Sequence, residues 1–424
     1  MDTIFALSSG APPAAIGVMR ISGPLAKHAL ESLGGGAPDP RRASLRTLRN
    51  SNGDVLDTAL VLWLPGPDNA TGEDSTELHC HGGRAVIGAI EASLLEIDGL
   101  RKAEPGEFTR RAFANGRMDL AQAEGLADLL FAETELQRQV LQVSAGGGLS
   151  KTIGEWREQV LGLSAQVESA LDFSDEDDVD QLAPPFFAHA SRLAGELAAW
   201  LNRPRVERLR DGIRVVLAGP PNAGKSTLFN ALLESEAAIV SEIAGTTRDV
   251  IERPVSFEGI PFVLTDTAGL HEGSEDAIER VGIERAREAL EKADIVLWLG
   301  PEGEGPPGAW EIEARIDRVE HFVKASPRMR LSAATGEGLG VLIGGLTQVA
   351  RDLLPRPGES AVNQRQHALL AEAQGAIDMI TPETDLLVVG EHLRTARSAF
   401  DRFSGQTGTE DMLDALFGQF CIGK

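Results

Sequence analysis

The chain has very little cysteine: only Cys80 and Cys421 occur among 424 residues. Two thiols so far apart in sequence make a disulfide framework implausible and favour a reducing compartment. The N-terminal segment Met-Asp-Thr-Ile-Phe lacks a basic region followed by a long apolar stretch, so we expect no signal peptide. No run of about 18 apolar residues occurs, which argues against a membrane span. We therefore expect a cytoplasmic protein without membrane attachment.

Positive charge is also scarce. The chain has 40 Lys and Arg residues and 64 Asp and Glu residues, which gives a net charge of −24. Proteins that grip nucleic acid draw most of their affinity from basic side chains on phosphates, so this chain would repel nucleic acid on average. An RNA-directed role would need a local basic patch or a basic partner. Two groups of basic residues are candidate patches, although dispersed surface arginines are the simpler interpretation: Arg41, Arg42, Arg46 and Arg49, and Arg101, Lys102, Arg110 and Arg111.

A phosphate-binding loop is the most informative motif that is present. Residues 219–226 have the sequence Gly-Pro-Pro-Asn-Ala-Gly-Lys-Ser, which fits G-x-x-x-x-G-K-[ST]. The apolar run 213–218 predicts a buried parallel strand before it, and residues 227–233 predict the helix after it. Lys225 is expected to reach the β- and γ-phosphates of a nucleoside triphosphate, and Ser226 to bind Mg²⁺.

Three further motifs follow in the order typical of a GTPase. Gly245-Thr-Thr-Arg-Asp249 lies where switch I is expected, with Thr247 as a Mg²⁺ ligand. The strand 262–265 leads into Asp266-Thr-Ala-Gly269, a D-x-x-G switch II in which Asp266 acts through the shell of the metal. Ser332-Ala333-Ala334 fits the loop beside the base. Together the four motifs predict a GTPase-like switch protein.

Two departures from the usual pattern bear on mechanism. Leu270 follows the D-x-x-G motif, where Ras-like enzymes hold a water-positioning Gln, so catalytic help must come from elsewhere. No N-K-x-D guanine-reading motif is present. By position, residues 323–326 should take its place, with Lys324 stacking on the base and Ser326 replacing the Asp. A hydroxyl cannot accept both guanine hydrogen bonds, so we expect guanine preference to weaken by about one to two orders of magnitude.

The length of the chain predicts two or three domains, and the sequence patterns divide it into four segments. Short strand-like runs and Gly/Pro-rich turns fill residues 1–117, and helical periodicity fills 118–211. Strand–helix alternation marks 212–348 as the P-loop α/β domain, and helix returns over 349–424. Because helix flanks the nucleotide domain on both sides, we expect an insertion into a helical domain, behind an N-terminal α/β domain.

Motifs spread over the whole chain resemble the MnmE (TrmE) family of tRNA modification GTPases. The matching segments are Arg20-Ile-Ser-Gly23, Gly72 to Leu78 with His81-Gly-Gly83, Pro105 to Thr109, Asp119 to Glu124, and the terminal Phe420-Cys-Ile-Gly-Lys424. The resemblance implies a GTPase activated by K⁺ and by dimerisation of its G domains. Asn222, Ser241, Ile243 and Thr246 match the K⁺ ligands of the family. Glu279 matches the glutamate that helps to position the attacking water, alongside Asp266 and Lys225 as catalytic residues.

The nucleotide contacts expected from the motifs and the resemblance are Asn222, Ala223, Gly224, Lys225, Ser226, Thr227, Ser241, Glu242, Ile243, Ala244, Gly245, Thr246, Thr247, Asp266, Thr267, Ala268, Gly269, Ser332, Ala333 and Ala334.

The resemblance also implies a folate site and two partners. Its N-terminal domain, here 1–117, binds a formyl-tetrahydrofolate and dimerises, and Arg20, Glu77, Arg117 and Lys424 fall at matching positions. An ordinary structural salt bridge is the competing interpretation of each. The family works with the FAD protein MnmG (GidA), as a heterotetramer, to install an aminomethyl-type group on C5 of the wobble uridine of tRNA. The folate supplies the one-carbon unit, and the partner would supply the main grip on tRNA.

Two other hypotheses for the function of the chain stay open. An Era-like regulatory or assembly switch would need neither the Arg20, Glu77 and Arg117 set nor the terminal Cys-Ile-Gly-Lys. A degenerate nucleotide-binding scaffold is suggested by Ser326.

Cys421 is either redox-active beside the folate or a small buried apolar residue. In His79-Cys80-His81, strand alternation should point Cys80 away from both histidines, which makes a metal site improbable.

Overall fold

The computed structural model covers the 424 residues and describes all of them except 1, 173–181, 236–251, 267–286, 408–409 and 424. It forms two compact units, one of residues 1–127, 150–165 and 393–424, the other of residues 128–149 and 166–392. Among the described helices, none has the length and apolar character needed to cross a bilayer.

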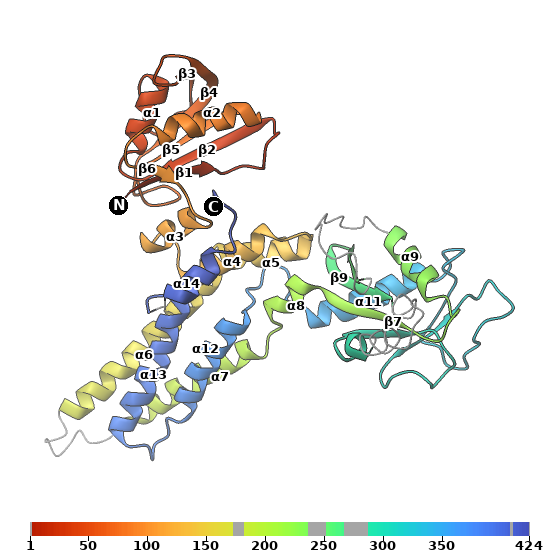
Figure 1. The fold of residues 1–424 in the computed structure, drawn as a ribbon. Helices are drawn as coiled ribbons and strands as arrows, with labels where there is room; N and C mark the ends of the chain where they lie inside the picture. Colours follow the sequence, from red (N-terminus) through yellow and green to blue (C-terminus); the bar gives the residue numbers. More distant parts are fainter. Residues whose placement is uncertain (1, 173–181, 236–251, 267–286, 408–409, 424) are drawn as a thin grey trace, which may run out of the picture. The chain divides into compact units, whose positions relative to one another are not determined.

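A six-stranded sheet with the order β3-β4-β5-β2-β1-β6 forms the N-terminal part of the first unit (Figure 1). All neighbouring pairs are antiparallel except β1 and β6. The strands are β1 (Thr3–Leu7), β2 (Ile16–Ser22), β3 (Ser44–Arg49), β4 (Val55–Leu64), β5 (Ser75–His81) and β6 (Leu100–Lys102).

Two helices, α1 (Ala26–Gly34) and α2 (Arg84–Leu95), bury their apolar faces against one side of this sheet. Alternation along the strands decides which side chains they cover, since Met19 and Ile21 of β2 join this core. Arg20 lies between them in sequence and so points to the opposite side, where Phe108 packs on Ile4 and Ala6. Phe108 belongs to α3 (Glu107–Ala114).

The C-terminal segment completes the first unit. Helix α14 (Glu410–Phe417) packs Phe417, with the following Phe420, on Ala123 and Ala127 of α4 (Leu120–Leu130). Leu413 and Leu416 also pack against this cluster, so the helix buries one apolar face.

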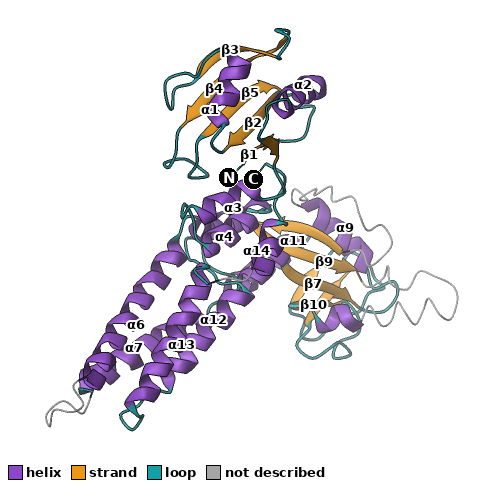
Figure 2. Cartoon of the chain, turned by 60° about the vertical axis from the view of Figure 1, so that its left-hand side comes forward, coloured by secondary structure: helices purple, strands orange, loops and turns teal. Residues whose placement is uncertain are grey.

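Long helices form the rest of the helical part, and Figure 2 shows the helices in purple. Helix α6 (Gly148–Asp172) buries an apolar stripe at helical spacing that includes Ile153, Val160 and Leu163. Trp156 of α6 contacts Phe400 of α13 (Leu386–Ser404), with ring centroids 6.3 Å apart. The remaining helices are α5 (Glu135–Ala145), α7 (Pro184–Leu201), α8 (Val206–Asp211) and α12 (Gln364–Asp378), of which α7 and α12 lie side by side.

A second six-stranded sheet, ordered β12-β11-β10-β7-β9-β8, lies within the second unit. Its pairs are parallel except β8 with β9, as expected for strand–helix alternation. The strands are β7 (Ile213–Ala218), β8 (Glu252–Phe257), β9 (Ile260–Asp266), β10 (Ile295–Trp298), β11 (Trp310–Ala314) and β12 (Met329–Leu331), and its helices are α9 (Lys225–Ser235) and α11 (Leu339–Leu353).

The predicted fold class is therefore confirmed: an N-terminal α/β domain, a helical domain and a P-loop GTPase domain. The strand predicted at 213–218 has the bounds that the sequence indicated. The boundaries at residues 117, 211 and 348 stay a proposal.

Candidate nucleotide-binding site

The phosphate-binding loop joins the end of β7 to the start of α9. Its backbone needs left-handed conformations, with φ of +150° at Gly219, +62° at Asn222 and +99° at Gly224. Glycine adopts these angles without steric cost, and Asn tolerates them better than most residues. A Cβ at Gly224 would lie 3.1 Å from the side chain of Arg315, so the loop is also closely packed there.

Lys225, the first residue of α9, lies under this loop and is 95% buried. Its Nζ donates to the carbonyl oxygens of Gly219 (2.8 Å) and Pro220 (3.0 Å). Burial lowers the pKa of Lys225, while the nearby charge of Asp266 acts in the opposite direction. An ammonium group has three donors, so one remains for a phosphate oxygen.

Ser226 and Asp266 meet beside the loop, as a Mg²⁺ site requires. The Ser226 hydroxyl donates to Asp266 Oδ2 at 2.7 Å, although 40 residues separate them in sequence. They become neighbours because β9, which ends at Asp266, pairs in parallel with β7. Hydroxyl and carboxylate oxygens are hard ligands, so this donor set fits Mg²⁺.

A cavity of about 660 Å³ extends from this loop toward the end of β11. Its walls include Asn222, Gly224, Lys225, Ser226, Thr227, Leu228, Ala314, Arg315, Asp317, Arg318, Leu331, Ala333 and Ala334. The predicted base loop 332–334 therefore lies on the same cavity as the predicted phosphate loop. The fully buried Ser332 donates through its hydroxyl to Asp317 Oδ1 at 2.5 Å.

The expectation that Lys324 stacks on a base and that Ser326 replaces the guanine-reading Asp is wrong. Lys324 is 99% buried, and its Nζ donates to the Trp298 carbonyl oxygen (2.7 Å) and to Glu311 Oε2 (2.5 Å). Neither Lys324 nor Ser326 lines the cavity. The expectation of weak guanine preference and the degenerate-scaffold hypothesis both depend on Ser326 lying at the base. Because Ser326 does not line the cavity, the structure gives neither of them support.

Asp317 occupies the position that sequence reasoning assigned to Ser326. It follows Ala314-Arg315-Ile316 directly at the carboxyl end of β11, and its pKa is lowered chiefly by the Ser332 hydrogen bond. The segment keeps the final Asp of N-K-x-D but has Ala for Asn and Arg for Lys. The missed signal was the strand itself, because Trp310–Ala314 ends three residues before Asp317.

Several predicted nucleotide contacts lie outside the described residues. They are Ser241, Glu242, Ile243, Ala244, Gly245, Thr246, Thr247, Thr267, Ala268 and Gly269, and the predicted water-positioning residue Glu279 lies outside too. Leu270 lies outside as well. Of the four predicted K⁺ ligands, Asn222 is described and lines the cavity.

Arg20 and Glu77 of the expected folate site face each other on paired strands. Arg20 donates to Glu77 Oε1 through Nε (3.1 Å) and Nη2 (2.9 Å), and its guanidinium lies 5.8 Å from the Phe108 ring centroid. His79 Nε2 lies 3.2 Å from the other Glu77 oxygen. Arg117 instead pairs with Asp68 at 3.3 Å. Lys424 lies outside the described residues.

The C-terminal tail reaches the same N-terminal sheet. Ile422 forms an antiparallel bridge with Pro105, and Gly423 has a φ of +98°. A Cβ at Gly423 would overlap the carbonyl oxygen of Leu7 in β1, so only glycine fits this approach. Leu7 follows Ala6, the residue paired with Arg20, which brings the tail near the Arg20–Glu77 pair.

Both cysteines have clear environments. Cys80 is 98% buried in the core of the N-terminal sheet, and burial raises the pKa of its thiol to about 12. His79 and His81 point away from it, toward Glu77 and Asp57 respectively. The predicted strand alternation is thus confirmed. Cys421 is exposed, so the interpretation as a buried apolar residue is wrong.

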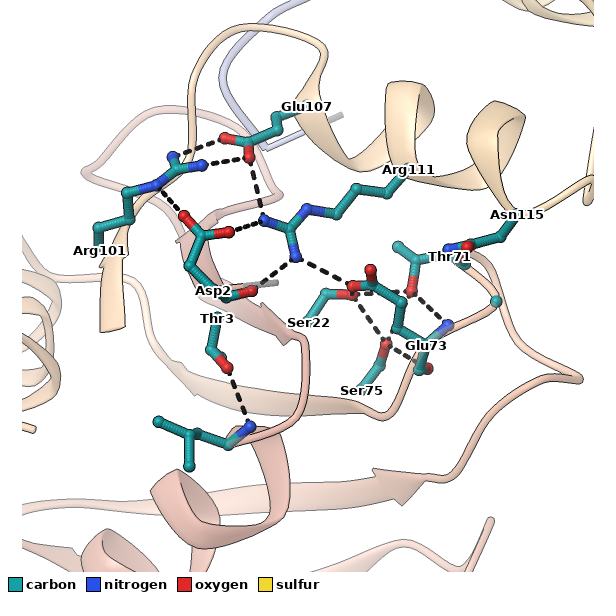
Figure 3. Close-up of polar contacts among 12 residues, drawn as sticks. Asp2, Thr3, Ser22, Thr71, Glu73, Ser75, Arg101, Glu107, Arg111 and Asn115 are labelled. Atoms are coloured by element: carbon teal, nitrogen blue, oxygen red, sulfur yellow. Dashed lines mark hydrogen bonds and ion pairs between the residues drawn. The ribbon is translucent and has the colours of Figure 1, made fainter. Parts of the chain in front are cut away.

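The second candidate basic patch is an ion-pair network, as Figure 3 shows for its centre. Arg101 donates to Asp2 (2.5 Å) and Glu107 (2.6 Å), and Arg111 donates to Asp2, Glu107 and Glu73. Lys102 and Arg110 have carboxylate partners too. Since each of these cations is paired within the chain, the group is a poor phosphate-binding surface.

Comparisons with known proteins cover the whole chain. Residues 3–117 match the family described as GTP-binding protein TrmE N-terminus, and residues 120–421 match the MnmE helical domain. The tRNA modification GTPase MnmE of Erythrobacter litoralis is 73% identical over 424 residues, 100% of each chain. That of Novosphingobium aromaticivorans is 58% identical over 435 residues, again 100% of each chain. The solved structure of Era with MgGDPNP and 16S ribosomal RNA is 23% identical, covering 40% of this chain and 68% of that one, with a TM-score of 0.26.

Proposed function

The chain belongs to the MnmE family of tRNA modification GTPases and acts in wobble-uridine modification, and from that premise we propose that it is a K⁺-stimulated GTPase using a folate one-carbon donor. The observation that carries the GTPase part is one cavity lined by Lys225, Ser226 and Asp317. These three supply a phosphate cation, a metal ligand and a carboxylate for the guanine edge.

Each described residue has a definite task in GTP hydrolysis. Lys225 binds the β- and γ-phosphates through a donor held in place by two loop carbonyls. Ser226 would hold Mg²⁺ with Asp266 in the shell of that ion, and the bound ion would neutralise charge that builds up on the phosphates. Asp317 accepts hydrogen bonds from guanine N1 and N2, with Ser332 fixing its orientation.

Hydrolysis also needs charge stabilisation and an oriented water. Asn222 offers an amide oxygen, the type of hard ligand that suits K⁺, from a loop residue on the cavity wall. Bound K⁺ would stabilise negative charge where other GTPases use an arginine finger. We assign the other ligands to Ser241, Ile243 and Thr246, and orientation of the water to Glu279.

The folate site is proposed around Arg20 and Glu77, with Arg117 and Lys424. A folate carries carboxylates that an Arg can bind and a pterin with donors that a carboxylate can accept. The polar pair lies on the sheet face not covered by α1 and α2, beside Phe108 and near the C-terminal tail. We further propose a homodimer that works with an MnmG-type FAD protein, which supplies most of the grip on tRNA.

Turnover measurements test the GTPase proposal. Purified protein at a concentration that allows dimers should hydrolyse GTP faster in K⁺ than in Na⁺, and ATP poorly in both. Asp266→Ala should lower GTP turnover severely, because the carboxylate in the shell of Mg²⁺ is removed. Equal rates in the two salts would contradict the K⁺ assignment, and equal rates with GTP and ATP would contradict guanine reading.

Isothermal titration with 5-formyl-tetrahydrofolate tests the folate part. We expect binding by the unaltered chain and its loss in Arg20→Met, with Arg49→Met as the matched control. Arg49 is exposed and donates to the Gly53 carbonyl oxygen on another strand connection. Absence of binding to the unaltered chain would favour an Era-like switch without folate chemistry.

A further inference from the structure

Arg315 joins the base end of the nucleotide cavity to the phosphate-binding loop. It follows β11 directly, two residues before Asp317, and its Nη1 donates to the main-chain carbonyl oxygen of Asn222 at 2.5 Å. The two residues lie 93 positions apart in sequence. Because the donor is a charged guanidinium, this is one of the stronger classes of hydrogen bond.

The aliphatic part of Arg315 also packs on the phosphate-binding loop. A Cβ at Gly224 would come within 3.1 Å of both Cγ and Cδ of Arg315, so the side chain crosses the loop at that glycine. Arg315 and Asn222 line the main cavity and also a second cavity of about 320 Å³. The Arg315 side chain therefore borders both cavities, and it touches the loop in two places.

The backbone at both ends of this contact is in the left-handed region. Asn222 and Arg315 each have a φ of +62°, which a branched or long side chain rarely adopts. Such conformations persist where the surroundings hold them. The Arg315–Asn222 hydrogen bond is a contact that holds both, since it fixes the carbonyl of one residue to the side chain of the other.

We propose that Arg315 is a positioning residue that couples guanine binding to K⁺ binding through Asn222; the inference rests on the proposed K⁺-stimulated GTPase activity. The Asn222 carbonyl is held by Arg315, in the segment 315–317 that follows β11, so the direction of the Asn222 amide depends on where that segment lies. A base bound against Asp317 fixes residues 315–317, and Arg315 carries that constraint to the K⁺ ligand. K⁺ affinity should then depend on a side chain that does not itself bind K⁺.

A matched pair of full-length variants tests this coupling. Arg315→Met keeps an unbranched apolar stem over Gly224 but has no donor, whereas Arg315→Lys keeps both a stem and a charged donor. At saturating GTP, Arg315→Met should raise the K⁺ concentration for half-maximal hydrolysis by about tenfold, the lower end for losing a hydrogen bond to a charged group. The same shift should appear when K⁺ is titrated calorimetrically into the protein bound to a non-hydrolysable GTP analogue. Arg315→Lys should restore it to within about threefold.

Asp317→Ala tests the other end of the coupling. It should raise the KM for GTP and, because the base then no longer fixes residues 315–317, it should also raise the half-saturating K⁺ concentration measured at saturating GTP; an unchanged K⁺ value would overturn the coupling. An unaltered half-saturation in Arg315→Met, or one that Arg315→Lys fails to restore, would overturn the coupling and leave the GTPase proposal intact. A wild-type enzyme that K⁺ does not stimulate would overturn the proposed function itself.

Discussion

Asp317 has the surroundings that reading a guanine edge demands. Its carboxylate faces the cavity beside Ala333 and Ala334, and the buried Ser332 hydroxyl holds one of its oxygens. That hydrogen bond lowers the pKa of Asp317, so the group is an anion at neutral pH and can accept two hydrogen bonds from N1 and N2 of guanine.

Asp317→Asn should therefore weaken GTP binding by about tenfold or more, because one charged acceptor is lost. The Asn amide can donate to a carbonyl at the 2-position of the base, so affinity should shift toward xanthosine triphosphate. Competition binding with the two nucleotides measures both effects. Ser326→Asp is the control and should not change the preference for GTP over ATP, since Ser326 does not line the cavity. A gain of guanine preference in that variant would restore residues 323–326 as the reader.

At the scale of elements, the network in Figure 3 attaches α3 to the edge of the N-terminal sheet. Asp2 precedes β1, Arg101 belongs to β6, and Glu107 and Arg111 belong to α3. Burial would raise the pKa of Glu107, but hydrogen bonds led by that from Arg101 outweigh it and hold this pKa below its usual value. The pKa of Asp2 is lowered mainly by its hydrogen bond with Arg101.

This network should make stability depend on pH in acid. Carboxyl groups with pKa values lowered by folding stabilise the native state fully above their unfolded values, 4.5 for Glu and 3.8 for Asp, and lose that contribution as pH falls through the folded values. The relevant window is about pH 5 to pH 3, which brackets these pKa values. As pH falls through it, the thermal unfolding temperature of Glu107→Gln should fall less steeply than that of the unaltered chain. Glu288→Gln, at an exposed pair, is the control. Identical pH profiles for Glu107→Gln and the unaltered chain would show that the network contributes nothing.

The C-terminal tail should be sensitive to a single methyl group. Gly423→Ala places a Cβ onto the Leu7 carbonyl at a φ of +98°, a combination that costs about 1–3 kcal/mol and should displace the tail from β1. Hydrogen exchange at residues 3–7 should accelerate, and affinity for 5-formyl-tetrahydrofolate should fall. Gly154→Ala has open space around its Cβ and should change neither. Unchanged exchange in Gly423→Ala would mean that the tail does not stabilise β1.

At the scale of the whole molecule, a net charge of −24 opposes tRNA binding by the chain alone. The ion pairs of Arg101, Lys102, Arg110 and Arg111 use cations that could otherwise have contacted phosphates. We expect the purified chain to bind tRNA at least about tenfold more weakly than its complex with an MnmG-type partner at low salt, with the difference shrinking as salt rises because the complex makes more phosphate contacts. Filter binding of one tRNA across a salt series measures this. Equal affinity with and without the partner would point to a basic surface that the described residues do not reveal.

The sequence by itself determined the phosphate-binding loop, the order of the GTPase motifs and the apolar stripes of the long helices. These patterns are local, because a strand, a loop and a helix within about 20 residues are fixed by spacing and by where glycine is tolerated. It also indicated family membership over the whole chain, through motifs spread from Arg20 to Phe420.

Only the tertiary structure decided which carboxylate lies at the base end of the cavity, which arginines are already paired, and where the C-terminal tail ends. Each depends on contacts between residues far apart in sequence, such as Asp317 with Ser332, Arg101 with Asp2, and Gly423 with Leu7. A position counted along the sequence selected Ser326, whereas the end of β11 in the folded sheet selects Asp317. Strand register and side-chain packing make that choice, and neither can be read from a motif with two of its residues replaced.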